Sequence, residues 1–427
     1  MFTAMFRLVD QEGACPPPLP RQSRGIHPSA RRVARLFLIG ALLVVAPACG
    51  GGDAVVKVVK KDPRQKTAKQ LVIEARDQAA AGKNDDADRS YSEAYATASE
   101  NEKLAFEILK EWVEFLTQSG RRKRACDVAK PYYESNAADP RGYALYADAL
   151  IAFNDGPQAL KVTGELVQLT ADDAGAHERH GRALLLMEKT EDGIEELRKA
   201  VQLEPASAKY HMSLGTALHD IGDYNKAALE FRAALKNAPD DPEANVLLGM
   251  ALRDQSELDE SRTYLDRAIA LDPRNGRAYF ELGVLYNKQL KQAEAEEAFG
   301  KAVKYAPNDS LFWYAYGEIY RVQDKIDDAI SAYRHAVQLE PPYPKAVGKL
   351  GSMLVEKKQY DDAEQYLIAA IRQDPKNPAP YWYLGKAYAA KHKNRPAIEN
   401  YEMFLKYAPA KDPDRERARE IINRLRR

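Results

Sequence analysis

The chain has 427 residues, of which 45% are hydrophobic and 30% charged, and its 63 Lys and Arg residues balance 63 Asp and Glu. This composition is typical of a soluble folded protein and excludes a disordered chain or a polytopic membrane protein. A net charge of zero argues against a nucleic-acid partner. The three cysteines, at 15, 49 and 126, are too few for a disulfide framework or a four-ligand zinc site.

The start of the chain has the pattern of an export signal. Arg31, Arg32 and Arg35 precede the apolar run 36–45, and small residues at 46–48 follow it. Residues 36–48 number only 13, whereas a membrane span takes about 20. We therefore predict a signal peptide over 1–48, with an over-long N-terminal region ahead of the arginines.

The segment around Cys49 resembles the lipobox of bacterial lipoproteins, in which the cysteine is acylated and becomes the first residue. Ala46, where leucine is commoner, and Pro47 depart from the usual pattern. Ordinary secretion and an uncleaved anchor are the alternatives. Lipidation at Cys49 would tether the protein to a membrane through the flexible segment 49–66. Gly50, rather than aspartate, follows the cysteine, which under the enteric sorting rule implies the outer membrane more than the inner.

The remainder of the chain is periodic. Prolines and glycines each recur at intervals of 34 residues, at Pro205, Pro239, Pro273, Pro307, Pro341, Pro375 and Pro409, and at Gly215, Gly249, Gly283, Gly317, Gly351 and Gly385. Such a period is the signature of a stacked repeat array. With the recurring leucines, alanines and aromatic residues, the pattern resembles the tetratricopeptide repeat, a helix-turn-helix unit of this length.

This resemblance implies an all-α fold, a right-handed α-α superhelix of about ten helical hairpins. Two degenerate repeats are expected over 67–139, with residues 102–105 interrupting their register, and eight contiguous repeats over 140–411. A capping helix over 412–427 would cover the open end. The recurring glycines would lie where the two helices of a hairpin approach most closely. No separate catalytic domain is expected.

In this family the concave groove is lined by positions two, five, nine, twelve and thirteen of the first helices. Large apolar residues stand at two of these positions, namely Met212, Val246, Met250, Phe280, Val284, Tyr314 and Trp382. An exposed apolar strip is typical of a site for an extended or helical peptide segment. Truncating Phe280 and Tyr314 would then weaken partner capture at little cost in stability. The alternative is that these side chains pack between neighbouring first helices.

The residue types that could bind a metal or act in catalysis occupy positions that packing within the repeat explains better than a metal or catalytic site does. His177, His180 and His211 could converge on a metal, but they occupy packing positions four and seven. Cys126 follows a basic run, yet it lies beside the closest packing. We expect no catalytic residues, no metal and no cofactor.

The sequence thus predicts a non-catalytic scaffold, lipid-anchored in a bacterial envelope and facing the periplasm. Among lipoproteins of this kind it looks most like the pilotins and envelope-assembly factors, which help secretion or motility complexes to assemble. The alternative is a regulator of a peptidoglycan or other envelope enzyme bound in the groove. Such analogies follow from the fold and do not choose between these functions.

Overall fold

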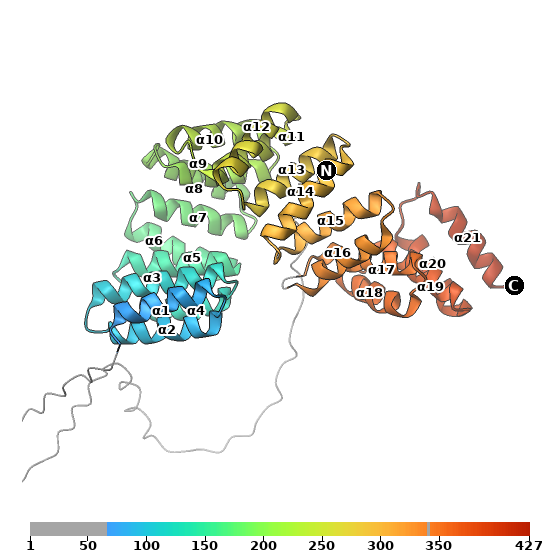
Figure 1. Ribbon diagram of the computed structural model, residues 1–427, viewed down its shortest axis with the longest axis horizontal. Helices are drawn as coiled ribbons and strands as arrows, with labels where there is room; N and C mark the ends of the chain where they lie inside the picture. Colours follow the sequence, from blue (N-terminus) through green and yellow to red (C-terminus); the bar gives the residue numbers. More distant parts are fainter. Residues whose placement is uncertain (1–65, 340–341) are drawn as a thin grey trace, which may run out of the picture. The chain divides into compact units, whose positions relative to one another are not determined.

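A computed structural model describes residues 66–339 and 342–427 of the chain. The predicted signal peptide, Cys49 and the tether up to residue 65 lie outside the described residues. Within them the chain forms 21 α-helices and no strand, so the all-α prediction is confirmed (Figure 1). None of these helices is long and apolar enough to cross a membrane.

The described residues divide into two compact units on either side of residue 115, namely 66–115 and those that follow, and each is described by itself. The first unit contains α1 (Ala68–Ala80), α2 (Asn84–Thr97) and most of α3 (Glu102–Gln118). Glu111 of α3 binds Arg76 of α1 at 2.7 Å and accepts a hydrogen bond from the Tyr91 hydroxyl of α2 at 2.8 Å. Residues 102–105, which interrupt the repeat register, form the first turn of a 17-residue helix.

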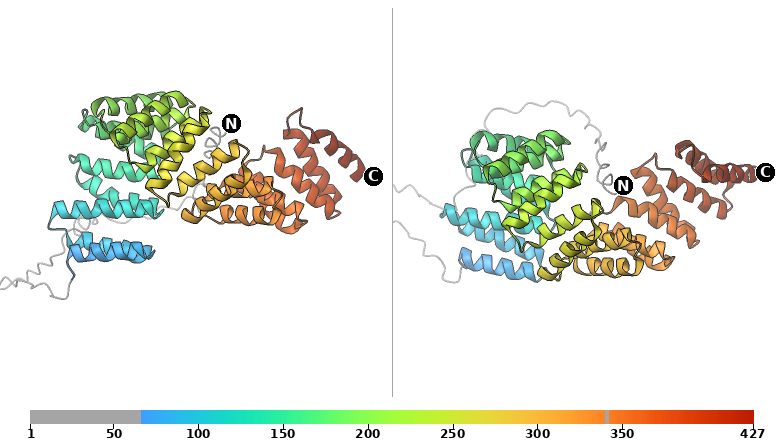
Figure 2. Two further views of the ribbon diagram at one scale, coloured as in Figure 1. Left: turned by 45° about the horizontal axis from the view of Figure 1, so that its top comes forward. Right: turned by 90° about the horizontal axis from the view of Figure 1, so that it is seen from above.

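The second unit is a series of helical hairpins between α4 (Arg122–Ser135) and the terminal α21 (Asp414–Leu425). The hairpins are α5 (Pro140–Phe153) with α6 (Gly156–Leu169), α7 (Ala174–Leu186) with α8 (Thr190–Leu203), α9 (Ala208–Asp220) with α10 (Tyr224–Asn237), α11 (Pro242–Asp254) with α12 (Leu258–Leu271), α13 (Gly276–Lys288) with α14 (Gln292–Tyr305), α15 (Ser310–Val322) with α16 (Ile326–Gln338), α17 (Pro344–Glu356) with α18 (Tyr360–Gln373), and α19 (Pro378–Ala390) with α20 (Asn394–Tyr407). The second helix of each hairpin packs on the first helix of the next (Figure 2).

The first helices begin every 34 residues because the same start signals recur. Asp or Asn side chains precede six of them and accept hydrogen bonds from backbone N–H groups of the first turn, as Asp241 does from Ala244 at 3.0 Å. Proline occupies the first helical position at Pro140, Pro242, Pro344 and Pro378, where a missing N–H costs little. The start of each hairpin is therefore encoded locally.

Each of these eight hairpins turns through one residue with positive φ. These residues are Asn154, Glu188, Gly222, Ser256, Leu290, Asp324, Lys358 and His392, again 34 apart. Positive φ is costly for side chains other than glycine, yet only one of the eight positions has glycine. The residue type at this position differs from one hairpin to the next, so the repeat pattern does not predict the positive φ.

Candidate partner-binding surface

The predicted partner-binding residues all lie on first helices of the second unit, and we call them the inner row. Its members are Met212 on α9, Val246 and Met250 on α11, Phe280 and Val284 on α13, Tyr314 on α15, and Trp382 on α19. The structure therefore places them on equivalent helices of four successive hairpins and of the last hairpin. Their exposure, however, differs from the predicted strip.

Three members of the inner row are buried. Val246 is 0%, Tyr314 7% and Trp382 8% exposed. Tyr314 contacts Tyr343 with ring centroids 4.6 Å apart, and Trp382 meets Tyr401 at 5.4 Å. Val246 is buried in a cluster with Leu265 and Leu282. The prediction that these three side chains are exposed is wrong, because side chains of neighbouring helices and loops cover them.

The other four members, Met212, Met250, Phe280 and Val284, are half-buried. Phe280 stacks on Phe312 of the next hairpin, with centroids 4.5 Å apart and planes inclined by 16°. It also contacts Phe299 of its own hairpin at 5.7 Å. Phe280 thus joins two hairpins, which contradicts the expectation that its removal would cost little stability. A binding role for these four residues stays a prediction.

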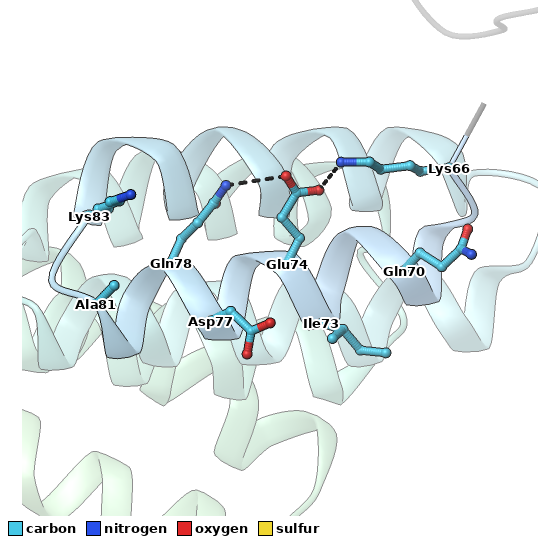
Figure 3. Close-up of a pocket in the computed structure, with 8 residues that line it drawn as sticks. All are labelled: Lys66, Gln70, Ile73, Glu74, Asp77, Gln78, Ala81 and Lys83. Carbon is cyan, nitrogen blue, oxygen red and sulfur yellow. Dashed lines mark hydrogen bonds and ion pairs between the residues drawn. The ribbon is translucent and has the colours of Figure 1, made fainter. Parts of the chain in front are cut away.

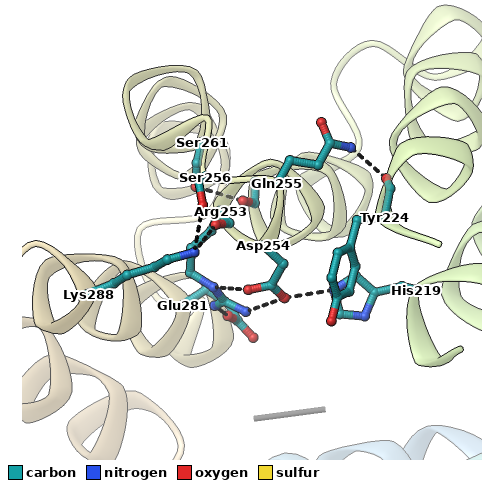
Figure 4. Close-up of polar contacts among 10 residues, drawn as sticks. His219, Tyr224, Arg253, Asp254, Gln255, Ser256, Ser261, Glu281 and Lys288 are labelled. Atoms are coloured by element: carbon teal, nitrogen blue, oxygen red, sulfur yellow. Dashed lines mark hydrogen bonds and ion pairs between the residues drawn. The ribbon is translucent and has the colours of Figure 1, made fainter. Parts of the chain in front are cut away.

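Beside the inner row, a polar network crosses three successive first helices (Figure 4). Asp254 accepts hydrogen bonds from His219 Nε2 and from Arg253 Nε and Nη2, all at 3.0 Å. Arg253 also binds Glu281 through Nη1. Because His219 lies on α9, the two central residues on α11 and Glu281 on α13, the network ties three hairpins together.

A fully buried carboxylate lies at the fifth position of α7. The Glu178 side chain is fully buried and binds Lys209 Nζ at 3.1 Å and Ser213 Oγ at 3.0 Å, both on α9. Arg182, one turn along α7, lies 3.4 Å away. Arg179 of the same helix binds Asp148 of α5 at 2.9 Å. Charged residues therefore link the first helices of three hairpins here as well.

Both carboxylates keep their charge because their partners outweigh the cost of burial. Burial alone would raise the pKa of Asp254, but the hydrogen bonds from His219 and Arg253 hold that pKa well below its usual range. Burial likewise opposes ionisation of Glu178, whereas Arg182 and Lys209 lower its pKa. The two clusters are satisfied ion networks rather than open acid or base sites.

The three histidines do not converge. His177 faces Glu196 through Nδ1 at 2.6 Å and the Ala171 carbonyl through Nε2 at 2.8 Å. His211 repeats this arrangement one hairpin later, with Glu230 and the Pro205 carbonyl, and His180 faces Thr163 at 3.0 Å. No group of His, Cys, Asp or Glu in the described chain is arranged to hold a metal ion.

His177 and His211, at the fourth position of their helices, instead contact the entering loop in the same way as other residues at this position do. Tyr143, Trp313 and Tyr381 each donate a hydrogen bond to the carbonyl six residues earlier, at 3.0, 2.8 and 3.1 Å. Those carbonyls belong to the loop that enters the hairpin. A polar ring at position four therefore fixes the loop between successive repeats.

Cys126 is the free cysteine of the described chain, and it is buried in α4. Burial, together with the nearby charges of Asp127 and Asp155, raises the pKa of its thiol to about 11. The protonated thiol is a poor nucleophile. The preceding basic residues therefore do not activate it.

In the first unit, a shallow recess lies along α1 (Figure 3). Its lining residues are Lys66, Gln70, Ile73, Glu74, Asp77, Gln78, Ala81 and Lys83. Lys66 pairs with Glu74, and Ile73 is 56% exposed. The recess is open and is lined mainly by polar or charged residues, which suits a solvated end of a helical stack better than an enclosed small-molecule site.

Sequence reasoning missed the ion network around Arg253. The signal was present, since Arg253 and Asp254 occupy positions twelve and thirteen of a first helix, where inner-face residues are expected. Their partners, His219 and Glu281, come from different repeats at different positions. The 34-residue alignment compares equivalent positions only, so it does not bring these residues together.

Four family models match the second unit. The model described as Cytochrome c-type biogenesis protein H TPR domain matches residues 301–415. Two models described as Tetratricopeptide repeat match 178–242 and 276–309, and one described as TPR repeat matches 249–289. No curated protein sequence was found to match the chain.

Solved structures of similar architecture are distant in sequence. A monomeric mutant of IFIT1 with m7Gppp-AAAA is 16% identical, with 78% of this chain and 80% of that chain covered and a TM-score of 0.50. Yeast Tom70 is 14% identical, with 84% and 95% covered and a TM-score of 0.46. YrrB, a TPR protein with an unusual peptide-binding site, is 24% identical over 44% of this chain and 96% of its own, at a TM-score of 0.34. At these identities the likeness concerns the fold alone.

Proposed function

Because the chain is a tetratricopeptide-repeat protein, we propose that it is a non-catalytic adaptor, anchored in a bacterial envelope by lipid at Cys49, that assists assembly of an envelope complex. A chain built from these repeats is a protein-interaction scaffold. The observation that carries the proposal is that helical hairpins occupy the described chain from α1 to α20. Protein segments, extended or helical, are the proposed partners.

The lipid anchor is supported by the sequence around Cys49. The arginines, the short apolar run and the small residues before the cysteine form an export signal, and three glycines follow. Acylation at Cys49 would leave the hairpins free to face the periplasm on a tether. Gly50 favours the outer over the inner membrane.

The anchor is tested by the Cys49→Ser substitution in the native host, with Cys15→Ser as the matched control. We expect Cys49→Ser to abolish labelling by a radioactive or clickable fatty acid, to accumulate as a larger precursor and to reduce membrane retention. Cys15→Ser should behave as the wild type. Membrane retention without any acyl label in the wild type would exclude the lipoprotein.

An assembly role is supported by the description of the longest matching family model, which refers to cytochrome c-type biogenesis. The alternative, regulation of a peptidoglycan or other envelope enzyme, rests on the same binding surface. Purification from detergent-solubilised membranes separates the two, because the first predicts structural components of a secretion, motility or other envelope complex and the second an envelope enzyme.

Partner binding on the inner row can be tested at single residues. A photo-cross-linking amino acid at Met250 or Val284, which are half-buried, should yield a partner adduct. Leu229 is 63% exposed on α10 and provides the control position, since it lies on a second helix. Adducts from Leu229 but not from Met250 would place the partner on the second helices instead.

A further inference from the structure

A recess lies between the second helices of two successive hairpins, α10 and α12. It has a volume of about 250 Å³ and is lined by Arg232, Leu235, Lys236, Pro239, Tyr264 and Arg267. Three of these six residues are cations, and the other three offer apolar or aromatic surface. The recess is separate from the inner row, which lies on the first helices.

The cations of the recess are only partly neutralised. Arg232 Nη2 lies 2.9 Å from Glu260, and Arg267 Nη2 lies 3.3 Å from Asp240. Lys236 makes no ion pair within the described chain. Three positive charges therefore face two carboxylates, and exposed ion pairs of this kind are weak.

Both arginines also retain unused donors. A guanidinium carries five N–H groups in a planar fork. The hydrogen bonds of Arg232 and Arg267 use Nη2 alone, to Glu260 in the first case and to Pro239 and Asp240 in the second. Nε and Nη1 of each side chain can therefore donate to a ligand without loss of the existing ion pairs.

The concentration of cations is not a requirement of the repeat. Residues equivalent to Arg232 in the other hairpins from α7 to α18 are Arg198, Asp266, Gly300, Arg334 and Ile368, and those equivalent to Lys236 are Gln202, Ala270, Lys304, Gln338 and Arg372. Ala233 and Lys301 take the place of Arg267 in the adjacent repeats. Hairpins therefore stack equally well without three cations at this interface.

We propose that this recess binds a phosphoryl oxyanion, with Arg232, Lys236 and Arg267 as its donors. A phosphate monoester carries close to two negative charges at neutral pH and several acceptor oxygens, which suits three surrounding cations better than a single carboxylate does. Arginine forks match the geometry of phosphate oxygens. Tyr264 and Leu235 would contact the organic group to which the phosphate is attached.

The same chemistry could come from a soluble phosphate ester or from a lipid headgroup with an exposed phosphate. The first arm of the test uses isothermal titration of the full chain carrying Cys49→Ser with inorganic phosphate and with phenyl phosphate. We expect saturable binding of both at one site, tighter for phenyl phosphate because its ring can contact Tyr264. The second arm uses sedimentation with phosphatidylcholine vesicles, with and without phosphatidic acid.

The decisive variant combines Arg232→Gln, Lys236→Gln and Arg267→Gln. Its matched control combines Arg198→Gln, Lys304→Gln and Arg334→Gln, which removes the same charge from equivalent positions of other hairpins. We expect at least a tenfold weakening in the first triple variant and less than a twofold change in the second, with similar thermal midpoints. Loss of vesicle binding in the first variant alone would identify a headgroup, and binding of the soluble probes alone would identify a soluble ester.

Two results would overturn the proposal. One is the absence of saturable binding of either phosphate at millimolar concentration together with no binding to phosphatidic-acid vesicles. The other is an equal loss of binding in both triple variants, which would show a response to net charge rather than to this recess. Neither result bears on the adaptor function, since that function depends on the first helices and on Cys49.

Discussion

Single glycines set the distance between the two helices of a hairpin. A Cβ atom at Gly215 would lie 2.6 Å from Phe231 of the partner helix, closer than real Cβ contacts. Gly348, also on a first helix, has no such restriction, because the nearest atom to its Cβ would be Ala370 Cβ at 3.6 Å. Two glycines in similar helices therefore have different reasons to be present.

This difference gives a prediction at the scale of one methyl group. Gly215→Ala should lower the free energy of unfolding by about 1–3 kcal/mol, because the hairpin must open or Phe231 must move. Gly348→Ala should instead raise it by about 0.5–1 kcal/mol through the better helix propensity of alanine. Thermal or denaturant unfolding of the two variants tests this. A similar loss in both would mean that the space at Gly348 is not available.

At the scale of helices, the inner row joins neighbouring hairpins. Phe280 stacks on Phe312 of the next hairpin, and Tyr314 is buried against Tyr333 and Tyr343. Side chains that fill such contacts stabilise the stack itself. A partner therefore has less apolar surface available on these first helices than the sequence indicates.

Replacing both aromatic residues should reveal this structural role. Phe280→Ala combined with Tyr314→Ala is expected to lower the free energy of unfolding by on the order of 4 kcal/mol, since each removes a packed ring. Leu229→Ala, at a position that is 63% exposed, should change it by less than about 0.5 kcal/mol. Denaturant unfolding followed by circular dichroism provides the measurement. An unchanged midpoint in the double variant would contradict the packing described here.

The network around Asp254 predicts a dependence of stability on pH. Its pKa is lower in the folded protein than in the unfolded chain, where an Asp titrates near pH 4. Its contribution is therefore present above about pH 4 and is lost as the pH falls through the folded pKa. Acid should weaken the connection between α9, α11 and α13.

Asp254→Asn isolates this contribution. At pH 7 the variant should be less stable by about 1–3 kcal/mol, because Arg253 and His219 lose a charged acceptor. The difference from the wild type should begin to shrink as the pH falls below about 4, where the carboxylate of the unfolded chain becomes protonated, and should disappear only as the pH approaches the lowered pKa of the folded state. Thermal unfolding across this range measures it, and Asp266→Asn, at an exposed position, is the control. A difference that stays constant with pH would point to lost packing rather than lost charge.

Sequence periodicity predicted the helical hairpins well, because their signals are local. Proline, the Asp or Asn cap and the close-packing glycine each act within one repeat, so a spacing of 34 residues reveals them. The exposure of Tyr314 or Val246 depends instead on which residues other helices place against it. That information is nonlocal, as are the contacts of Arg253 with Glu281, and the repeat pattern alone does not contain it.

At the scale of the second unit, the stability of each hairpin depends on the hairpins packed against it. Each hairpin packs on the next along the chain, so the last hairpin needs its own cover. In α21, Ala418 and Ile422 are buried in a cluster with Trp382, Tyr401 and Phe404. Arg417 of the same helix lies over the Trp382 ring, 5.7 Å from its centroid.

Removing this cover should affect solubility before it affects the rest of the fold. Deletion of residues 412–427 would expose the cluster around Trp382, and we expect the shortened chain to aggregate or self-associate in light scattering. Hydrogen exchange should be faster in α19 and α20 and unchanged in α7 to α10. A chain that remains monodisperse with unaltered exchange would show that α21 is dispensable.

The buried cysteine of α4 can report on local opening of the helices around it. With its pKa raised to about 11 and its sulfur enclosed, Cys126 is protected from a thiol reagent in the closed state. Labelling can proceed only during the brief intervals in which the surrounding helices separate. The rate of labelling therefore counts spontaneous opening events at this end of the second unit. A ligand that holds α4 against the hairpin next to it would slow that rate, whereas a ligand bound at the far end of the second unit would leave it unchanged.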